Sequence, residues 1–350
     1  IGVHKTIEQL RQLGFTPIEL ERYCGSNKIW STKVKRLRLP DLLCVKTGTR
    51  WEVRTKSKLE IKMSDAPGNP DRVWDAGLRD DDLIAFIASN DAGGGPCIAD
   101  EAVYFTVQSL RSSVALSRVG PPKSASEGAE RDRTWPSTVP NREGVVVSVT
   151  GERITVRQFA DAERAERNQS YSIRDKHAYV IPGDRFKAGA SILAGAPDGI
   201  AHLNTFLGRV YHPLNEILSP NDVDRYAAVK ALRFRDDPRN QVVVSLEALV
   251  RDEHEARVRL EAAGTLAANG SSLGEDVVAQ FVWNNPDRAD LQMEAILVLT
   301  ELAGSAFSRE MLMRAATDST LSNSELRQAA VWGLGRAGIH AYEDIVQFID

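Results

Sequence analysis

A short helical pattern, A-x-x-x-L, recurs at a nearly constant step through residues 221–350 of the chain. It falls at Ala228/Leu232, Ala262/Leu266, Ala295/Leu299 and Ala330/Leu334, with steps of 34, 33 and 35 residues. A second set of apolar positions, expected in the second helix of each unit, recurs every 34 residues at Val243, Val277, Met311 and Ile345. A pair of helices of this length cannot bury its apolar face alone, so neighbouring pairs must stack. The pattern therefore predicts an all-α solenoid.

Glycines follow the first helices of three units, where a helix end favours a left-handed residue: Gly270, Gly304 and Gly338. With these glycines and the double register, residues 221–350 resemble HEAT and related bacterial helical repeats. That resemblance implies a scaffold that recruits a protein partner, senses a ligand or clamps a nucleic acid.

Composition and charge narrow the class of protein further. No segment approaches the roughly eighteen apolar residues of a membrane helix, and residues 1–13 lack the apolar centre of a signal peptide. Cys24, Cys44 and Cys97 are far apart, as expected of reduced thiols in a cytoplasmic protein, and the six histidines are too scattered for a zinc site. The chain starts without methionine and ends inside a helical pattern, as a fragment of a longer protein would.

The net charge of −4 conceals a strongly basic stretch near the N-terminus. Between Arg22 and Lys62 there are twelve Lys and Arg residues against three acids, Asp41, Glu52 and Glu60, which gives a local balance of +9. A basic surface of that size suits a polyanion, although a solvated charged face would have the same composition.

Changes in composition along the chain predict a multidomain protein with five segments. Residues 1–119 read as mixed α/β, residues 120–143 as a Pro- and Ser-rich linker, and residues 144–200 as a small all-β barrel. Residues 201–220 are a connector to the helical repeats over 221–350. Trp135 is unexpected in a free linker, and we expect it to pack onto a neighbour.

The α/β segment contains a hairpin pattern that places acids and cations together. Two apolar strands, Pro40–Val45 and Trp51–Lys56, flank the turn-like sequence KTGTR. Because strand side chains alternate, Glu52, Arg54 and Lys56 project from one face, and the turn brings Asp41 back beside them. Two carboxylates can hold a hard divalent ion such as Mg²⁺, which polarises a phosphodiester and activates water, while a nearby cation stabilises the developing charge.

The order Pro-Asp, hairpin, Glu-x-Arg-x-Lys resembles the core of PD-(D/E)xK nucleases over roughly Val3–Leu116. The resemblance implies a leading helix at Ile7–Leu13, strands at Leu83–Ile87 and Val103–Val107, and a helix at Ser109–Leu116. It also implies Mg²⁺ or Mn²⁺ held by Asp41 and Glu52.

The catalytic cation departs from the family pattern, because Arg54 stands where the family usually has lysine. We therefore expect Asp41 and Glu52 with Arg54 or Lys56 as the catalytic residues, while a second match, Glu60-Ile61-Lys62, stays open. The flanking cations expected to hold nucleic-acid phosphates are Lys33, Lys35, Arg36, Arg38, Arg50 and Lys58.

Residues 144–200 alternate short strands with turn glycines, including a hairpin around Thr150-Gly151. Their order resembles the barrel-sandwich modules in the β subunit of bacterial RNA polymerase. The resemblance implies a fold alone, since the same glycines suit any small barrel.

The first hypothesis is a cytoplasmic, Mg²⁺-dependent nuclease that acts on DNA rather than RNA, with no membrane partner and with restriction or phage defence as its setting by analogy. The second hypothesis is a non-catalytic scaffold, with a degenerate nuclease fold that binds nucleic acid or protein. A transcription-associated subunit is a third, resting on the barrel resemblance.

Overall fold

A computed structural model describes most of the chain, namely residues 1–21, 30, 32, 37–66, 69, 72–91, 96–121, 129–302 and 304–336. The chain divides into two compact units. The first unit combines Ile1–Ile18 with Pro40–Val210, and the second combines Glu19–Leu39 with Tyr211–Asp350. The expected domain boundaries did not anticipate that Glu19–Leu39 would group with the C-terminal helices.

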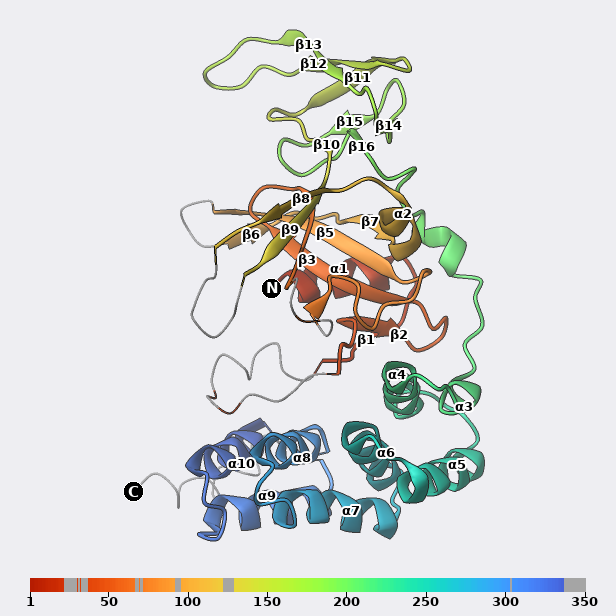
Figure 1. Ribbon diagram of the computed structural model, residues 1–350, viewed down its shortest axis with the longest axis vertical. Coiled ribbons are helices and arrows are strands. Elements are labelled where there is room, and N and C mark those ends of the chain that lie inside the picture. The colour runs from red at the N-terminus through yellow and green to blue at the C-terminus, as the bar shows by residue number, and fades with distance from the viewer. Residues whose placement is uncertain are drawn as a thin grey trace. The chain divides into compact units, whose positions relative to one another are not determined.

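The centre of the first unit is a mixed sheet (Figure 1). It follows helix α1 (Gly2–Gln12), and its strands are β1 (Pro17–Glu19), β2 (Leu42–Cys44), β3 (Arg50–Lys56), β5 (Leu83–Asp91), β6 (Pro96–Ile98) and β7 (Val103–Thr106). The order across the sheet is β1-β2-β3-β5-β6, with β7 also paired to β5. Strands β2 and β3 are antiparallel, whereas β3 and β5 are parallel. The expected hairpin and two later strands therefore form close to their predicted positions, whereas the expected helix Ile7–Leu13 begins earlier, at Gly2.

Two apolar clusters cover the two faces of this sheet. One face carries Trp51 and Val53 of β3 and packs against Ile7 and Leu10 of α1. The apolar positions of α1 recur at three- and four-residue steps, so they form a single stripe toward the sheet. The opposite face carries Ile84, Phe86 and Phe105, which pack against a second, smaller sheet.

That smaller sheet corrects two expectations. Its strands are β4 (Ile61–Asp65), β9 (Arg131–Trp135) and β8 (Leu116–Val119), in that order. The expected linker 120–143 therefore contributes structure in its described part, because β9 lies between β4 and β8. The expected helix Ser109–Leu116 is shorter: α2 spans Val107–Ser112, and Leu116 begins β8.

The apolar positions of β9 explain why a charged stretch forms a strand. Trp135 is 1% exposed, and its indole N–H donates to the carbonyl of Leu110 at 2.9 Å, as the expected packing of this tryptophan implied. On the same face of the sheet, Asp65 accepts hydrogen bonds from Arg131 and Arg133 at 2.7 to 2.9 Å. Ion pairing thus lets arginines lie beside an otherwise apolar layer.

Residues 137–195 are all β in character and form two further sheets. One has the order β13-β12-β11-β15 and the other β10-β16-β14. Their bounds are β10 (Ser137–Thr138), β11 (Gly144–Val149), β12 (Arg153–Gln158), β13 (Arg167–Ser172), β14 (His177–Ala178), β15 (Arg185–Phe186) and β16 (Ala194–Gly195). The β11–β12 hairpin confirms the expected turn around Thr150.

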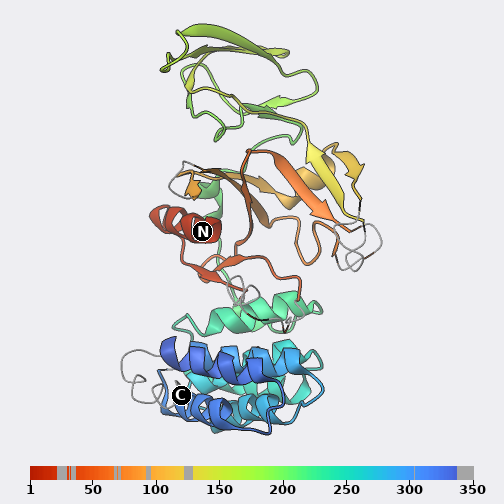
Figure 2. The same cartoon turned by 90° about the vertical axis from the view of Figure 1, so that its left-hand side faces the viewer.

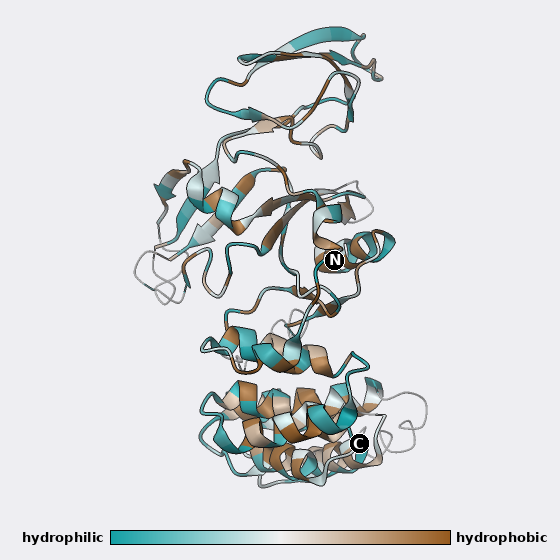
Figure 3. Cartoon of the chain, turned by 90° about the vertical axis from the view of Figure 1, so that its right-hand side faces the viewer, coloured by the Kyte–Doolittle hydropathy of each residue, from teal (hydrophilic) through white to brown (hydrophobic). Residues whose placement is uncertain are grey.

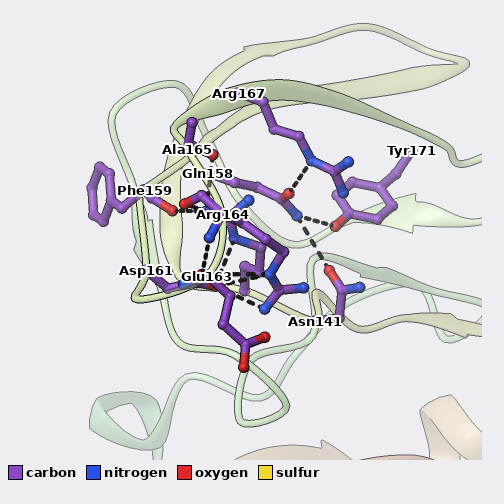
Figure 4. Close-up of polar contacts among 10 residues, drawn as sticks. Asn141, Gln158, Phe159, Asp161, Glu163, Arg164, Ala165, Arg167 and Tyr171 are labelled. Atoms are coloured by element: carbon purple, nitrogen blue, oxygen red, sulfur yellow. Dashed lines mark hydrogen bonds and ion pairs between the residues drawn. The ribbon is translucent and has the colours of Figure 1, made fainter.

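Side-chain hydrogen bonds fix the loop between β12 and β13 (Figure 4). Gln158 is fully buried, donates to the Tyr171 hydroxyl at 3.0 Å and accepts from Arg167 at 3.1 Å. The nearby Arg164 is paired with Asp161 at 2.7 Å. A buried amide needs such partners, because leaving its polar atoms unpaired would cost about 1–3 kcal/mol.

The second unit is helical in its described part, as expected for the repeat region, and the predicted repeat positions Gly338 and Ile345 lie outside the described residues. After the turn η3 (Leu203–Phe206) of the first unit, the helices are α3 (Pro213–Glu216), α4 (Asp222–Leu232), α5 (Arg239–Asp252), α6 (Ala256–Ala268), α7 (Ser272–Trp283), α8 (Ala289–Glu301), α9 (Ala306–Thr317) and α10 (Ser324–Arg336). Helices α4, α6, α8 and α10 form one row and α5, α7 and α9 the other (Figures 1 and 2). The Ala and Leu of each A-x-x-x-L pattern lie on the first row and are at most 3% exposed.

Close packing within this first row explains the small residues of the repeat. A side chain at Gly264 of α6 would meet Val298 of α8 at 2.7 Å, and one at Gly333 of α10 would meet Thr300 of α8 at 2.4 Å. Apolar residues continue along these helices and along the central sheet (Figure 3). Among the described residues, no helix combines the length and apolarity that crossing a membrane requires.

A buried ion pair joins the start of β3 to the turn that precedes β5. Arg50 and Asp82 have side chains only 2% and 4% exposed. Arg50 Nε donates to Asp82 Oδ1 at 2.8 Å, a second guanidinium nitrogen contacts Oδ2, and the backbone N–H of Arg79 donates to the same carboxylate. The pair therefore connects two segments that the parallel β3–β5 pairing must bring together.

Removing one partner of this pair should leave a buried charge uncompensated. We expect Arg50→Met to lower the opening free energy of the β3 and β5 amides by about 3–5 kcal/mol, measured by hydrogen exchange. The double substitution Arg50→Met/Asp82→Asn, which retains an acceptor for Arg79, should regain most of that loss. Arg111→Met removes an exposed pair with Asp75 and should change protection by less than about 1 kcal/mol. Equal protection in all three variants would contradict a structural role for the pair.

Candidate functional site

Asp41 lies at the point where the chain enters β2. Strand β2 pairs with β3 in the register Leu42↔Trp51 and Leu43↔Arg50, and Asp41 immediately precedes β2. Asp41 Oδ2 accepts the backbone N–H of Val53 at 2.7 Å, in place of the carbonyl that a continuing strand would offer. The carboxylate is thereby held against the edge of β3, and the sequence prediction that the turn returns Asp41 to this strand is confirmed.

Glu52 and Arg54 lie on the face of β3 that is opposite to Trp51 and Val53. This alternation follows from the two-residue period of the strand, and the buried Trp51 fixes which set faces the core. The Glu52 side chain is 13% exposed and Arg54 is 39% exposed, and Arg54 Nη2 lies 2.5 Å from Glu52 Oε1. Arg54 is therefore ion-paired with the candidate metal ligand.

Lys56, the next residue on this face, has an altered affinity for its proton. Burial lowers its pKa below the ordinary value of 10.5, and the charges of Arg54 and Lys62 lower it further, while Asp132 and Glu60 act in the opposite direction. A cation that is easier to deprotonate can act as a proton carrier, which arginine cannot do readily. Perturbed ionisable groups of this kind are common at functional sites and also occur in structural clusters.

Lys62 and Asp132 extend this polar cluster onto the smaller sheet. Lys62 of β4 lies 2.9 Å from Asp132 of β9, and Ser64 donates to Asp132 at 2.9 Å. The bond from Lys62 is the main reason that the pKa of Asp132 is lowered. Asp132 was missed at the sequence level because it falls in the expected linker. The alternation of R-D-R-T-W at residues 131–135 is the signal that could have found it.

The expected phosphate-binding cations differ in their placement. The expectation for Arg50 is wrong, because its side chain is buried and paired with Asp82 and so does not face a polyanion. Lys58 is 79% exposed beside Glu60 at 3.5 Å, and Arg38 is exposed. Lys33, Lys35 and Arg36 lie outside the described residues.

The donor set for a metal is therefore small. Within the described ranges, no group of three or more His, Cys, Asp or Glu side chains could hold an ion. Asp41 and Glu52 form a two-carboxylate set, which suits Mg²⁺ because this ion retains several waters and often takes only one or two protein carboxylates. Binding there would have to displace Arg54 from Glu52 Oε1.

Comparison with known proteins adds no family to this description. No protein-family model matches the chain, and no curated protein is a detectable relative.

The charges around Lys56 make opposite predictions for two substitutions. In competitive acetylation across a pH series, we expect the titration midpoint of Lys56 to lie below 10.5. Arg54→Gln should raise that midpoint and Asp132→Asn should lower it, because the first removes a repelling cation and the second an attracting anion. Lys58, which is 79% exposed, serves as the reference lysine.

The lowered pKa of Lys56 also links its protonation to the stability of the protein. Because the folded protein binds this proton less tightly than the unfolded chain, the free energy of unfolding should rise with pH between the lowered pKa and 10.5. In the acetylation experiment, a Lys56 midpoint that neither Arg54→Gln nor Asp132→Asn moves would show that these two residues do not influence Lys56.

Proposed function

We propose that this protein is a Mg²⁺-dependent phosphodiesterase that cleaves nucleic acid at Asp41 and Glu52. The observation that supports the proposal is the contact of Asp41, just before β2, with β3: its carboxylate accepts the N–H of Val53, the residue after Glu52, at 2.7 Å. Two neighbouring carboxylates are a suitable donor set for one Mg²⁺.

The surrounding fold supports the same proposal. A helix, an antiparallel hairpin and a strand parallel to the second hairpin strand follow in the order that the sequence resemblance implied. Asp41 is oriented by the Val53 N–H, so its position is fixed without a metal. When bound, Mg²⁺ supplies polarisation of the phosphodiester and activation of water.

Within this proposal, the two cations of β3 have different tasks. Lys56 is the proton carrier, because burial and the charges of Arg54 and Lys62 weaken its hold on a proton. Arg54 supplies fixed positive charge beside the phosphate once it leaves Glu52. Lys62, engaged with Asp132 at 2.9 Å, sets the electrostatic field around Lys56.

One observation favours the second candidate function, a scaffold that binds nucleic acid without cleaving it. The Glu52–Arg54 ion pair occupies an oxygen that the metal would need. A protein in which this pair persists would bind a polyanion through exposed cations of the first unit such as Lys58, with no metal at Asp41.

Isosteric substitutions separate these functions. We expect Asp41→Asn and Glu52→Gln each to reduce Mg²⁺-dependent cleavage of labelled duplex DNA, single-stranded DNA or RNA at least about a hundredfold, since each removes a metal ligand while keeping side-chain size. Lys56→Met should reduce cleavage comparably. Glu60→Gln is the matched control and should retain cleavage activity. Loss of cleavage in this variant would favour the Glu60-Ile61-Lys62 alternative.

A metal-binding measurement makes the test independent of activity. Titration with Mn²⁺, followed by its paramagnetic effect on water relaxation, should find a site in the wild type that Asp41→Asn weakens. Binding of nucleic acid with no cleavage by the wild type, and no effect of Asp41→Asn on Mn²⁺, would instead establish the non-catalytic scaffold.

A further inference from the structure

The segment Glu19–Leu39 groups with the C-terminal helices, although the α/β unit precedes and follows it in the sequence. Three of its described residues, Leu20, Trp30 and Thr32, make specific contacts with these helices. The contacts involve the row α4, α6, α8 and α10 and the residues that lead into α10.

The first contact is made by the main chain of Leu20. Lys230 of α4 is 2% exposed, lies 3.5 Å from Glu301 of α8, and donates from Nζ to the Leu20 carbonyl at 3.1 Å. A buried ammonium has three donors to satisfy, so this carbonyl is part of the polar interior of the helical unit. Leu20 itself is fully buried.

The second contact is the side chain of Trp30. It is 8% exposed and belongs to the same apolar cluster as Ala228, Leu266 and Leu299 of the first helical row. A tryptophan buries more apolar area than most other side chains, and such residues dominate the energetics of protein–peptide interfaces.

The third contact recognises both the backbone and the hydroxyl of Thr32. Glu325 Oε2 accepts the Thr32 N–H at 2.7 Å and its hydroxyl at 2.6 Å. Asn323 donates from Nδ2 to the same hydroxyl at 2.8 Å, while its Oδ1 accepts the Glu325 N–H. The residues that begin α10 therefore hold Thr32 with three hydrogen bonds in a fixed geometry.

We propose that this anchor surface, formed by Lys230, Asn323, Glu325 and the apolar residues around Trp30, is a peptide-binding surface whose ligand is the chain's own segment Glu19–Leu39. Its recognition chemistry is that of an extended peptide: a main-chain carbonyl, an indole in an apolar core, and a main-chain N–H beside a hydroxyl. The same sequence binds there when supplied as a separate peptide. This inference requires neither the metal nor the nucleic acid of the proposed function.

Tethering explains why the surface is occupied in the wild type. The segment belongs to the same chain as the anchor surface, so it competes with a separate peptide as an intramolecular ligand. A separate peptide at micromolar concentration therefore cannot compete unless the tethered segment is weakened.

The test uses the full chain and a fluorescein-labelled peptide with the sequence of residues 19–39. In a Trp30→Ala/Thr32→Ala variant, the peptide should bind at least tenfold more tightly than it binds the wild type, measured by fluorescence anisotropy. A peptide carrying Trp30→Ala should bind the variant at least tenfold more weakly. Equal binding to both proteins, binding to neither, or equal binding of both peptides would overturn the proposal.

A second measurement applies if that variant does not fold. Glu325→Gln removes the acceptor charge for Thr32 and keeps the segment sequence intact. It should accelerate hydrogen exchange of the Thr32 amide at least fivefold, because that N–H donates to Glu325 in the wild type. Glu310→Gln, an exposed acid-to-amide change on α9, is the matched control. Equal exchange rates in the two variants would also overturn the proposal.

Discussion

The register between β2 and β3 determines the chemistry of the first unit. A slip of one residue would turn Glu52, Arg54 and Lys56 toward α1 and would remove Trp51 from the apolar cluster that it shares with α1. Burying three charges in that cluster would be far less stable, so the packing of Trp51 determines which face of β3 is polar. The short turn with Gly48 at φ 69° and the Asp41 contact to Val53 hold the same register from its two ends. The pairing of β2 with β3 therefore determines both the packing of the core and the positions of the candidate site residues in this region.

The elements that were predictable from sequence depend on neighbours close along the chain. The hairpin from Pro40 to Lys56, the α1 stripe and the helices that carry A-x-x-x-L are all encoded within a few turns or strands, and each is present. The contact of Asp41 with the N–H of Val53 belongs to this group, because only twelve residues separate them. Type of element and facing side chains follow directly from such periodicity.

Features decided by distant partners could not be predicted. Arg50 looked like a surface cation because its partner Asp82 lies 32 residues away. Asp132 looked like part of a linker because Ser64 and its strand are 68 residues away. The stretch from Arg22 to Arg38 looked like a basic face of the α/β region, yet its described residues Trp30 and Thr32 contact the helical unit instead. Composition records the charges of a segment but carries no information about which surface it meets.

The insertion of Glu19–Leu39 into the helical unit also affects how the protein is made. Thr32 emerges from the ribosome 293 residues before its partner Glu325. At about 5–20 residues per second, that interval is on the order of 15–60 s. For most of it, until the helices that carry Ala228, Leu266 and Leu299 have been made, Trp30 lacks the apolar cluster that buries it in the native state. The helical unit is therefore completed late in synthesis. Until its last helices have been made, the apolar residues of its earliest segment must be kept from aggregating.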